Sequence, residues 1–147
     1  MATLTQYTKA DFVSLNKSGF SAKEIRKYTN RGGYCVLSLF AVYKSEFMLL
    51  KQGKSVLGCG VIRYKWSREI KSFGWWLYDI WICPDMRGKG YGSVLMNKLL
   101  DELKNRHVSI VRLVVKDDNA RAIHLYGKTG FTVEQKQDTY IIMRYEL

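Results

Sequence analysis

A segment that alternates glycines with cations offers the clearest chemistry in this sequence. Residues 84–92 read Pro-Asp-Met-Arg-Gly-Lys-Gly-Tyr-Gly, with Arg87 and Lys89 beside three glycines. Glycines let a backbone approach a ligand closely and turn its N–H groups inward. The next stretch has leucines at helical spacing, and the N-terminus of a helix favours anions. The segment therefore predicts a pyrophosphate cradle, although its spacing matches neither the Rossmann nor the P-loop motif.

Other reactive side chains show no such pattern. The cysteines Cys35, Cys59 and Cys83 are odd in number, form no C-x-x-C pair and stand in apolar stretches. They predict buried, reduced thiols rather than disulfides or a zinc site, with a nucleophilic Cys83 as the alternative. His107 and His124 have no ligand spacing. The sequence predicts that no metal is used and that the protein is cytoplasmic.

Hydrophobic patterning places the glycine segment between a strand and a helix. An apolar, aromatic run at residues 73–83 precedes it, and an apolar stripe at helical spacing follows through residues 90–106. The β-branched run at 109–116 suits a strand buried on both faces, so that a βαβ unit is expected. Further strands are expected at 34–43, 47–51 and 56–64 and in the alternating C-terminus from Ile141 to Leu147. Further helices are expected at 9–16, 21–28 and 119–129. A basic stretch at 63–71 is expected to separate the strands at 56–64 and 73–83.

Bulk properties indicate one globular domain over residues 1–147. The chain carries 24 Lys and Arg against 13 Asp and Glu, a net charge of +11. This excess attracts anions, but it is dispersed and accompanies no nucleic-acid-binding motif. No apolar run reaches the length of a membrane span, and residues 1–9 are too polar for a signal peptide. A monomer or homodimer is expected, with the final strand as a possible pairing edge.

Two spaced motifs resemble one enzyme family. Residues 87–92 match the R/Q-x-x-G-x-G/A motif of the GNAT N-acetyltransferase superfamily. Residues 78–84 resemble its fourth strand with a terminal proline, and residues 119–131 resemble its N-x-x-A-x-x-L-Y-x-x-x-G-F segment. The resemblance covers residues 78–131 and is more specific than either motif alone, because the motifs follow in the family's order.

The resemblance implies an α/β fold with a mixed, mostly antiparallel sheet, a central parallel βαβ unit and flanking helices. It also implies acetyl-CoA as co-substrate, with the pantetheine arm in a gap between two splayed strands. Backbone groups of the first strand would bind the pantetheine amides, and the glycine loop would hold the pyrophosphate. Asn119 at the start of the next helix would contact the arm or the phosphates, with a plain helix N-cap as its alternative or additional role. The implied cofactor-binding residues are Ile80, Ile82, Arg87, Gly88, Lys89, Gly90, Tyr91, Gly92 and Asn119.

Two residues are implied as catalytic. Tyr126 matches the family's usual proton donor to the departing thiolate, with packing in the core as the alternative. Asp79 is the only acid in residues 73–83 and would take a proton from the ammonium group, directly or through a water; the alternative is a bond to a loop or sheet edge. Tyr78 stands where some relatives carry Glu. An N–H near Ile82 would stabilise the oxyanion.

The expected function is direct transfer of acetyl from acetyl-CoA to a primary amine, in a small molecule or protein, through a ternary complex. The alternatives are a non-catalytic acyl-CoA-binding regulatory domain and an acetyltransferase for a tRNA or ribosomal amine. The acceptor is an unidentified amine. Aromatic residues near the expected acceptor end could form a wall for a cation or flat substrate, or pack within the sheet: Trp66, Trp75, Trp76, Tyr78 and Trp81.

Overall fold

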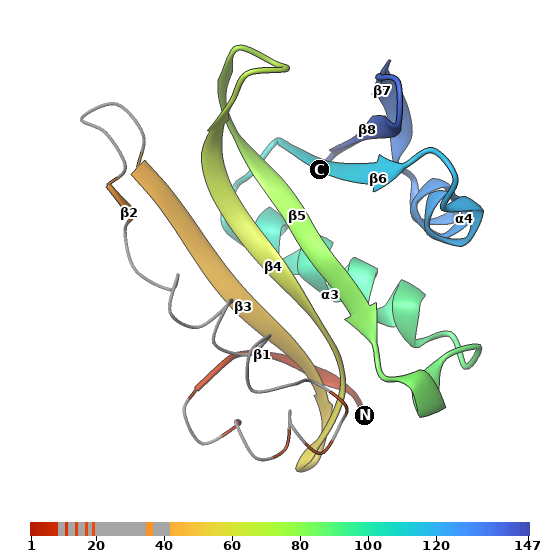
Figure 1. Ribbon diagram of the computed structural model, residues 1–147. Helices are drawn as coiled ribbons and strands as arrows, with labels where there is room; N and C mark the ends of the chain where they lie inside the picture. The colour runs from red at the N-terminus through yellow and green to blue at the C-terminus, as the bar shows by residue number, and fades with distance from the viewer. Residues whose placement is uncertain (9–10, 12–13, 15–16, 18, 20–34, 37–41) are drawn as a thin grey trace.

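The computed structural model describes residues 1–8, 11, 14, 17, 19, 35–36 and 42–147, and Figure 1 shows a twisted mixed sheet with α3 across one face. The strand order is β1-β3-β4-β5-β6-β8-β7, and β2 pairs with β3. The elements are β1 (Thr3–Gln6), β2 (Cys35–Val36), β3 (Val42–Gln52), β4 (Ser55–Ser67), β5 (Ser72–Ile82), the 3₁₀ turn η2 (Pro84–Met86), α3 (Tyr91–Asn105), β6 (Ile110–Lys116), α4 (Ala120–Thr129), β7 (Thr132–Lys136) and β8 (Tyr140–Glu146). The predicted α/β class and central βαβ unit are confirmed.

The hairpin of β4 and β5 is longer than predicted. The basic stretch expected at residues 63–71 is mostly strand, with only a short turn left between β4 and β5. Tyr64 pairs with Trp75, with ring centroids 5.1 Å apart, and Trp66 pairs with Phe73 at 5.5 Å. Aromatic cross-strand pairs stabilise antiparallel strands, so they extend the hairpin through its charged residues.

The two parallel strands diverge after a short paired stretch. Residues 75–77 of β5 pair with residues 111–113 of β6, while β5 continues to Ile82 and β6 to Lys116. Beyond the paired stretch, the facing edges of β5 and β6 no longer form hydrogen bonds with each other. The strands therefore leave a gap in which an extended ligand could form hydrogen bonds with the backbone of β5.

A β-bulge interrupts β5 at the start of this gap. The register with β4 shifts between Cys59 and Val61, so that Asp79 and Ile80 oppose the single residue Gly60. Asp79 has φ of +51°, a conformation that is strained for most residues but tolerated by Asp. A Cβ at Gly60 would lie 2.9 Å from Ile80 Cδ1 and 3.0 Å from Leu99 Cδ1, so a larger residue there would require these side chains to shift.

The apolar stripe of α3 fills the main core. Its buried residues are the predicted Leu95, Met96, Leu99, Leu100 and Leu103. They pack with apolar residues from one face of the sheet, which places the helix N-terminus beside the end of β5. The helix is therefore held firmly by burial of a continuous apolar face.

The prediction that β6 is buried on both faces is wrong. Val111, Leu113 and Val115 are buried toward the α3 side, whereas Val114 is 41% exposed. The β-branched run therefore reflects strand propensity as well as burial.

The C-terminal strands also differ from expectation. β8 lies between β6 and β7, so the final strand is internal and is not a pairing edge. Ile141 and Met143 pack in the core as predicted, but Ile142 on the opposite side is also buried. The edge strand β7 was not predicted, because its sequence Thr-Val-Glu-Gln-Lys is mostly polar and exposed.

Some predicted segments cannot be compared with the structure. The helices expected at residues 9–16 and 21–28, and most of the strand expected at 34–43, lie outside the described residues. Within the described part of the chain, no helix has the length and hydropathy to cross a membrane. Cys59 and Cys83 are both buried.

Candidate active site

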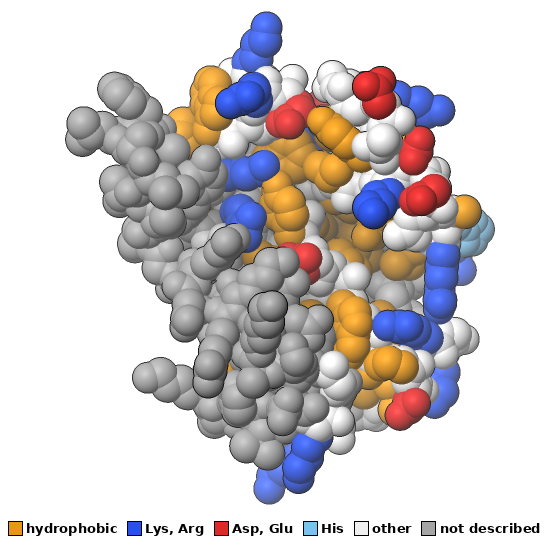
Figure 2. All heavy atoms as spheres, in the orientation of Figure 1, with side chains coloured by type: hydrophobic (Ala, Val, Ile, Leu, Met, Phe, Trp, Pro, Cys, Tyr) orange, Lys and Arg blue, Asp and Glu red, His pale blue; other side chains and the backbone are white. Residues whose placement is uncertain are grey.

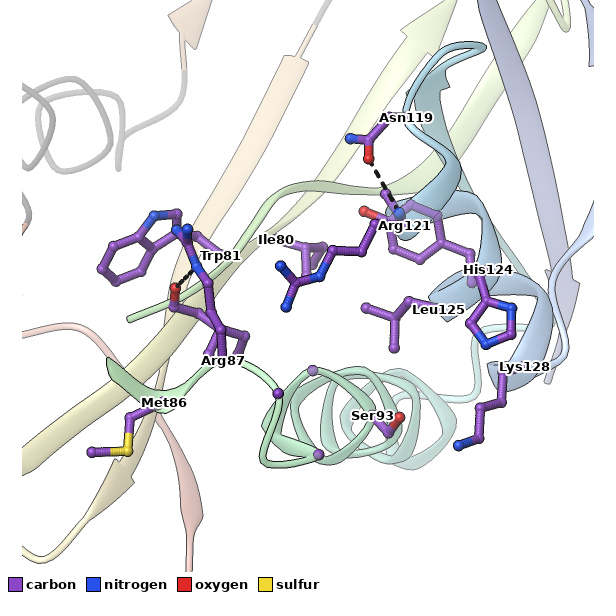
Figure 3. A pocket seen from close by; sticks show the side chains of 16 residues that line it. Ile80, Trp81, Met86, Arg87, Ser93, Asn119, Arg121, His124, Leu125 and Lys128 are labelled. Carbon is purple, nitrogen blue, oxygen red and sulfur yellow. Dashed lines mark hydrogen bonds between the residues drawn. The ribbon is translucent and has the colours of Figure 1, made fainter. Parts of the chain in front are cut away.

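A pocket of about 640 Å³ lies beside the free edge of β5, between the start of α3 and α4. In Figure 3, the side chains of α4 reach toward the loop that precedes α3, across an open space. The lining residues are Ile80, Trp81, Ile82, Met86, Arg87, Gly88, Gly90, Gly92, Ser93, Asn119, Arg121, Ala122, His124, Leu125, Tyr126 and Lys128. This set includes four cation-capable side chains and no carboxylate.

The glycine loop has the geometry of an anion cradle. Gly88 has φ of +76° and Gly90, the N-cap of α3, has φ of +84°. A Cβ built on either residue meets no protein atom within 4 Å, so the space beside this backbone is open. No side chain caps α3, and its first turn has no acidic residue. The N–H groups at the helix start and the positive end of the helix dipole therefore face the pocket, and no acidic side chain of the first turn offsets their positive charge.

The last residues of β5 present backbone groups to the gap. The Cys83 N–H donates to Leu57 O at 2.9 Å, on the β4 side of the strand. Because N–H and C=O groups of successive residues in an extended strand point to opposite edges, those of Ile82 point toward the gap. The pairing of Trp81 with Cys59 gives Ile80 the same orientation. Arg87 Nε donates to Ile82 O at 3.0 Å, as drawn in Figure 3.

The start of α4 is capped by Asn119. Its side-chain oxygen accepts a hydrogen bond from the Ala122 N–H at 3.1 Å. Asn119 is therefore the N-cap of α4, as predicted, and it also lines the pocket. Capping fixes the orientation of the helix start relative to the glycine loop.

Three basic side chains of α4 were missed from the sequence. Arg121, His124 and Lys128 line the pocket across from the glycine loop, as Figure 3 shows. Their spacing of three and four residues places them on one face of a helix. This spacing, following the predicted N-cap, was the available signal.

Tyr126 lies deeper in the pocket wall. It is 8% exposed, and burial raises the pKa of its phenol above the ordinary value of 10.0. Its ring packs near Phe131, with centroids 6.1 Å apart. The phenol is therefore protonated at neutral pH and can act as a hydrogen-bond or proton donor. Tyr126 therefore both packs against the core and lines the pocket.

The other predicted residues lie outside this lining. Asp79 is exposed at the bulge, next to the lining residue Ile80. Lys89 is exposed between two lining glycines, and Tyr91 packs partly against the core at the start of α3. The structure thus brings together Ile80, Ile82, Arg87, Gly88, Gly90, Gly92, Asn119 and Tyr126, and leaves Asp79, Lys89 and Tyr91 at its border.

Comparison with known protein families now decides the relationship. The model of the acetyltransferase (GNAT) family matches residues 11–131, which include β5, the glycine loop, α3 and α4. The chain belongs to the GNAT family.

Relatives of known activity match parts of this GNAT chain. Over 95 residues it is 32% identical to the thialysine N-epsilon-acetyltransferase of Bos taurus, which covers 65% of this chain and 55% of that enzyme. Over 55 residues it is 42% identical to the [ribosomal protein bS18]-alanine N-acetyltransferase of Escherichia coli strain K12, which covers 37% of each. The chain therefore matches about half or less of the length of these curated relatives.

A solved structure extends the similarity to nearly the whole chain. A GNAT family acetyltransferase from Elizabethkingia anophelis, with acetyl-CoA bound, shares the fold with a TM-score of 0.68 and 17% sequence identity. The match covers 99% of this chain and 98% of that one. Among the described residues of this GNAT domain, no group of three His, Cys, Asp or Glu side chains could hold a metal ion.

Proposed function

We propose that this GNAT chain is an N-acetyltransferase that moves the acetyl group of acetyl-CoA directly to a primary amine. The observation that carries the proposal is the uncapped α3 N-terminus with Gly88 and Gly90, which faces basic side chains across one pocket. Both curated relatives described above are named for transfer to an amine, thialysine in one and a ribosomal alanine in the other. Their particular acceptors are not carried over to this chain.

The described residues fit coenzyme A in charge and shape. The open backbone of Gly88 and Gly90 suits a pyrophosphate, which the α3 N–H groups would bind. Arg121 and Lys128 suit further phosphate groups from the α4 side. The N–H and C=O groups of Ile80 and the C=O of Ile82 suit the pantetheine amides, as an added strand would pair. Lys89 and Tyr91 would also contribute to cofactor binding, through their backbone N–H groups in the loop and at the start of α3.

The side chains near the divergence of β5 and β6 provide the chemistry. The thioester supplies an activated acetyl group, so that an N–C bond forms as the C–S bond breaks. The Ile82 N–H would stabilise negative charge that develops on the carbonyl oxygen. Asp79 would accept, through a water, the proton that the ammonium group loses before the attack. The Tyr126 hydroxyl would donate its proton to the departing sulfur and would be reprotonated by the second proton that the nitrogen loses as the amide forms.

Direct transfer agrees with the placement of the nearest thiol. Cys83 is 6% exposed, does not belong to the pocket lining, and donates its S–H to Val56 O at 3.1 Å. A buried thiol that already donates a hydrogen bond is a poor nucleophile. A ternary complex of both substrates is therefore proposed, and a cytoplasmic location stays a prediction.

The test is a thiol-release assay with acetyl-CoA and a panel of amino acids, polyamines, aminoglycosides and N-terminal peptides. Release should depend on an amine, and double-reciprocal plots at several amine concentrations should intersect. Parallel plots or an acetylated Cys83 would overturn direct transfer. Binding of acetyl-CoA without release by any amine would instead indicate the non-catalytic alternative.

A further inference from the structure

The face of the hairpin opposite α3 carries two cations that lie against aromatic rings. Arg63 Cζ lies 4.7 Å from the centroid of Tyr78, and Lys65 Nζ lies 4.9 Å from Trp76 and 5.3 Å from Tyr78. Figure 2 shows Lys and Arg side chains beside hydrophobic ones on this face, over β4 and β5. The four residues form one cation–aromatic cluster on adjacent strands.

The cluster differs from other cations on the same sheet. Arg112 makes a bidentate pair with Glu134, with bonds of 2.6 and 2.9 Å, and Arg144 pairs with Glu146. Among the described residues, neither Arg63 nor Lys65 has a carboxylate oxygen within 4 Å. The chain therefore pairs Arg112 and Arg144 directly with carboxylates. Arg63 and Lys65 instead lie against rings, and Lys65 interacts electrostatically with the nearby carboxylate of Glu69, without a close ion pair.

The cluster is held in place by neutral contacts. Arg63 Nε donates to Ser45 Oγ at 2.7 Å, and within the described part of the chain no hydrogen bond engages its two terminal guanidinium nitrogens. The Tyr78 and Trp76 rings restrict both cations without cancelling their charge, because a ring attracts a cation through its quadrupole. A cation that is ordered in advance binds an anion at a lower entropic cost.

The position of the cluster relates it to the reaction centre. Tyr78 directly precedes the bulge residues Asp79 and Ile80, and Ile80 belongs to the cofactor pocket on the other side of the sheet. Two residues along a strand span roughly 7 Å, so the guanidinium over Tyr78 lies only a short molecule's length from the bulge. An amine held near Asp79 would place a group a few bonds away against Arg63 and Lys65.

We propose that the acceptor is a small amine that also carries an anionic group, a carboxylate or a phosphate, bound by Arg63 and Lys65. This inference rests on the proposed acetyltransferase function. Asp79 follows Tyr78 at the bulge, and the two cations lie against Tyr78, so a short zwitterion would have a carboxylate near its ammonium group and cations near its anion. A polyamine, which carries only positive charge, would be repelled by the cluster.

The test compares matched acceptors that differ only in the anion. β-Alanine and 4-aminobutyrate are compared with their amides, and phosphoethanolamine with ethanolamine, by thiol release from acetyl-CoA. The anionic member of at least one pair should have a kcat/KM about tenfold to a hundredfold higher, the range for one charge-assisted hydrogen bond. The two carboxylate pairs and the one phosphate pair distinguish a carboxylate from a phosphate acceptor.

Variants then assign the preference to the cluster. Arg63→Gln and Lys65→Gln should each lose about tenfold or more in kcat/KM for the anionic acceptor, with less than about threefold change for its neutral partner. Arg63→Lys and Lys65→Arg should restore part of the preference. Lys54→Gln in the distant β3–β4 turn removes the same charge and should change neither acceptor.

The outcomes separate this inference from the proposed function. Equal kcat/KM for acid and amide, or equal losses for both acceptors in the Gln variants, would overturn the anionic acceptor while leaving the acetyltransferase intact. Release of no thiol with any amine, despite bound acetyl-CoA, would overturn both.

Discussion

The hydroxyl of Tyr126 can be tested apart from its ring. The residue is buried and packs near Phe131, so Tyr126→Phe should fold normally. If the hydroxyl protonates the departing sulfur, kcat should fall about tenfold to a hundredfold while the Kd of acetyl-CoA stays nearly constant. Stopped-flow turnover and calorimetric binding measure the two quantities.

A matched control separates this effect from lost packing. Tyr145 also contacts Phe131, with ring centroids 5.3 Å apart, but does not line the pocket. Tyr145→Phe should therefore leave kcat unchanged. Full activity in Tyr126→Phe would show that the thiolate leaves without help from this residue.

Asp79 presents a different question, because it is exposed at the bulge rather than within the pocket lining. If it accepts the ammonium proton, Asp79→Asn should lower kcat/KM by roughly a hundredfold at neutral pH. The loss should shrink at alkaline pH, where more of the amine is already neutral. A pH profile of kcat/KM for both proteins provides the measurement, and a loss that is constant with pH would indicate a structural role.

At the scale of the elements, the glycine loop joins β5 to α3 and should bind phosphate through its backbone. Gly90→Val places a side chain in the open space where the cradle would hold pyrophosphate. Acetyl-CoA at a hundredfold excess over Kd should stabilise the unaltered protein by about 2–3 kcal/mol, and the variant should lose this effect. Thermal denaturation with and without the ligand measures it.

Gly53 provides the control for backbone strain. It also has positive φ, +59°, with no atom within 4 Å of a built Cβ, but it lies in the β3–β4 turn. Gly53→Val should cost a similar amount of stability, on the order of 1 kcal/mol, yet keep the ligand effect. If acetyl-CoA stabilises the Gly90→Val and Gly53→Val variants equally, the glycine loop is not a phosphate cradle.

The ion pair between β6 and β7 should make stability depend on acid. The Arg112 hydrogen bond lowers the pKa of Glu134, and the nearby charges of Arg112 and Arg144 act in the same direction. A carboxyl with a lowered folded-state pKa stabilises above its unfolded pKa, about 4.3, and loses that contribution as pH falls through its folded value. Glu134→Gln should therefore reduce stability at pH 7 but much less at about pH 2.

Urea denaturation of both proteins at several pH values measures this difference. A double-mutant cycle with Arg112→Met separates the pair from the individual side chains. If Glu134→Gln costs the same at both pH values, the pair does not account for the effect.

The sequence predicted those elements whose signals are local. The apolar stripe of α3 repeats within one helix, and the positive φ angles of the glycine loop fall on glycines, which are visible in the sequence itself. By contrast, the bulge at Asp79 depends on the register of β5 against β4, and the length of that hairpin depends on cross-strand aromatic pairs. Polar β7 becomes a strand only because β8 pairs with it. Such contacts between distant residues cannot be read from local composition.

At the scale of the whole molecule, the net charge of +11 should assist binding of a polyanionic cofactor. Exposed charges farther than about 10 Å from a phosphate are largely screened at 0.1 M salt, whereas contacting charges keep most of their effect. The KM for acetyl-CoA should therefore rise several-fold between about 50 and about 500 mM NaCl, mainly through the cations that line the pocket.

Neutralising particular cations separates local charge from the overall field. Arg121→Gln and Lys128→Gln should each raise the KM for acetyl-CoA and flatten its dependence on salt, because both side chains line the pocket. Lys54→Gln changes the net charge by the same amount in the distant β3–β4 turn and should preserve the dependence. Steady-state kinetics over the salt series compares the three variants. If all three flatten the dependence equally, the general field attracts the cofactor, and the α4 cations have no special part in binding its phosphates.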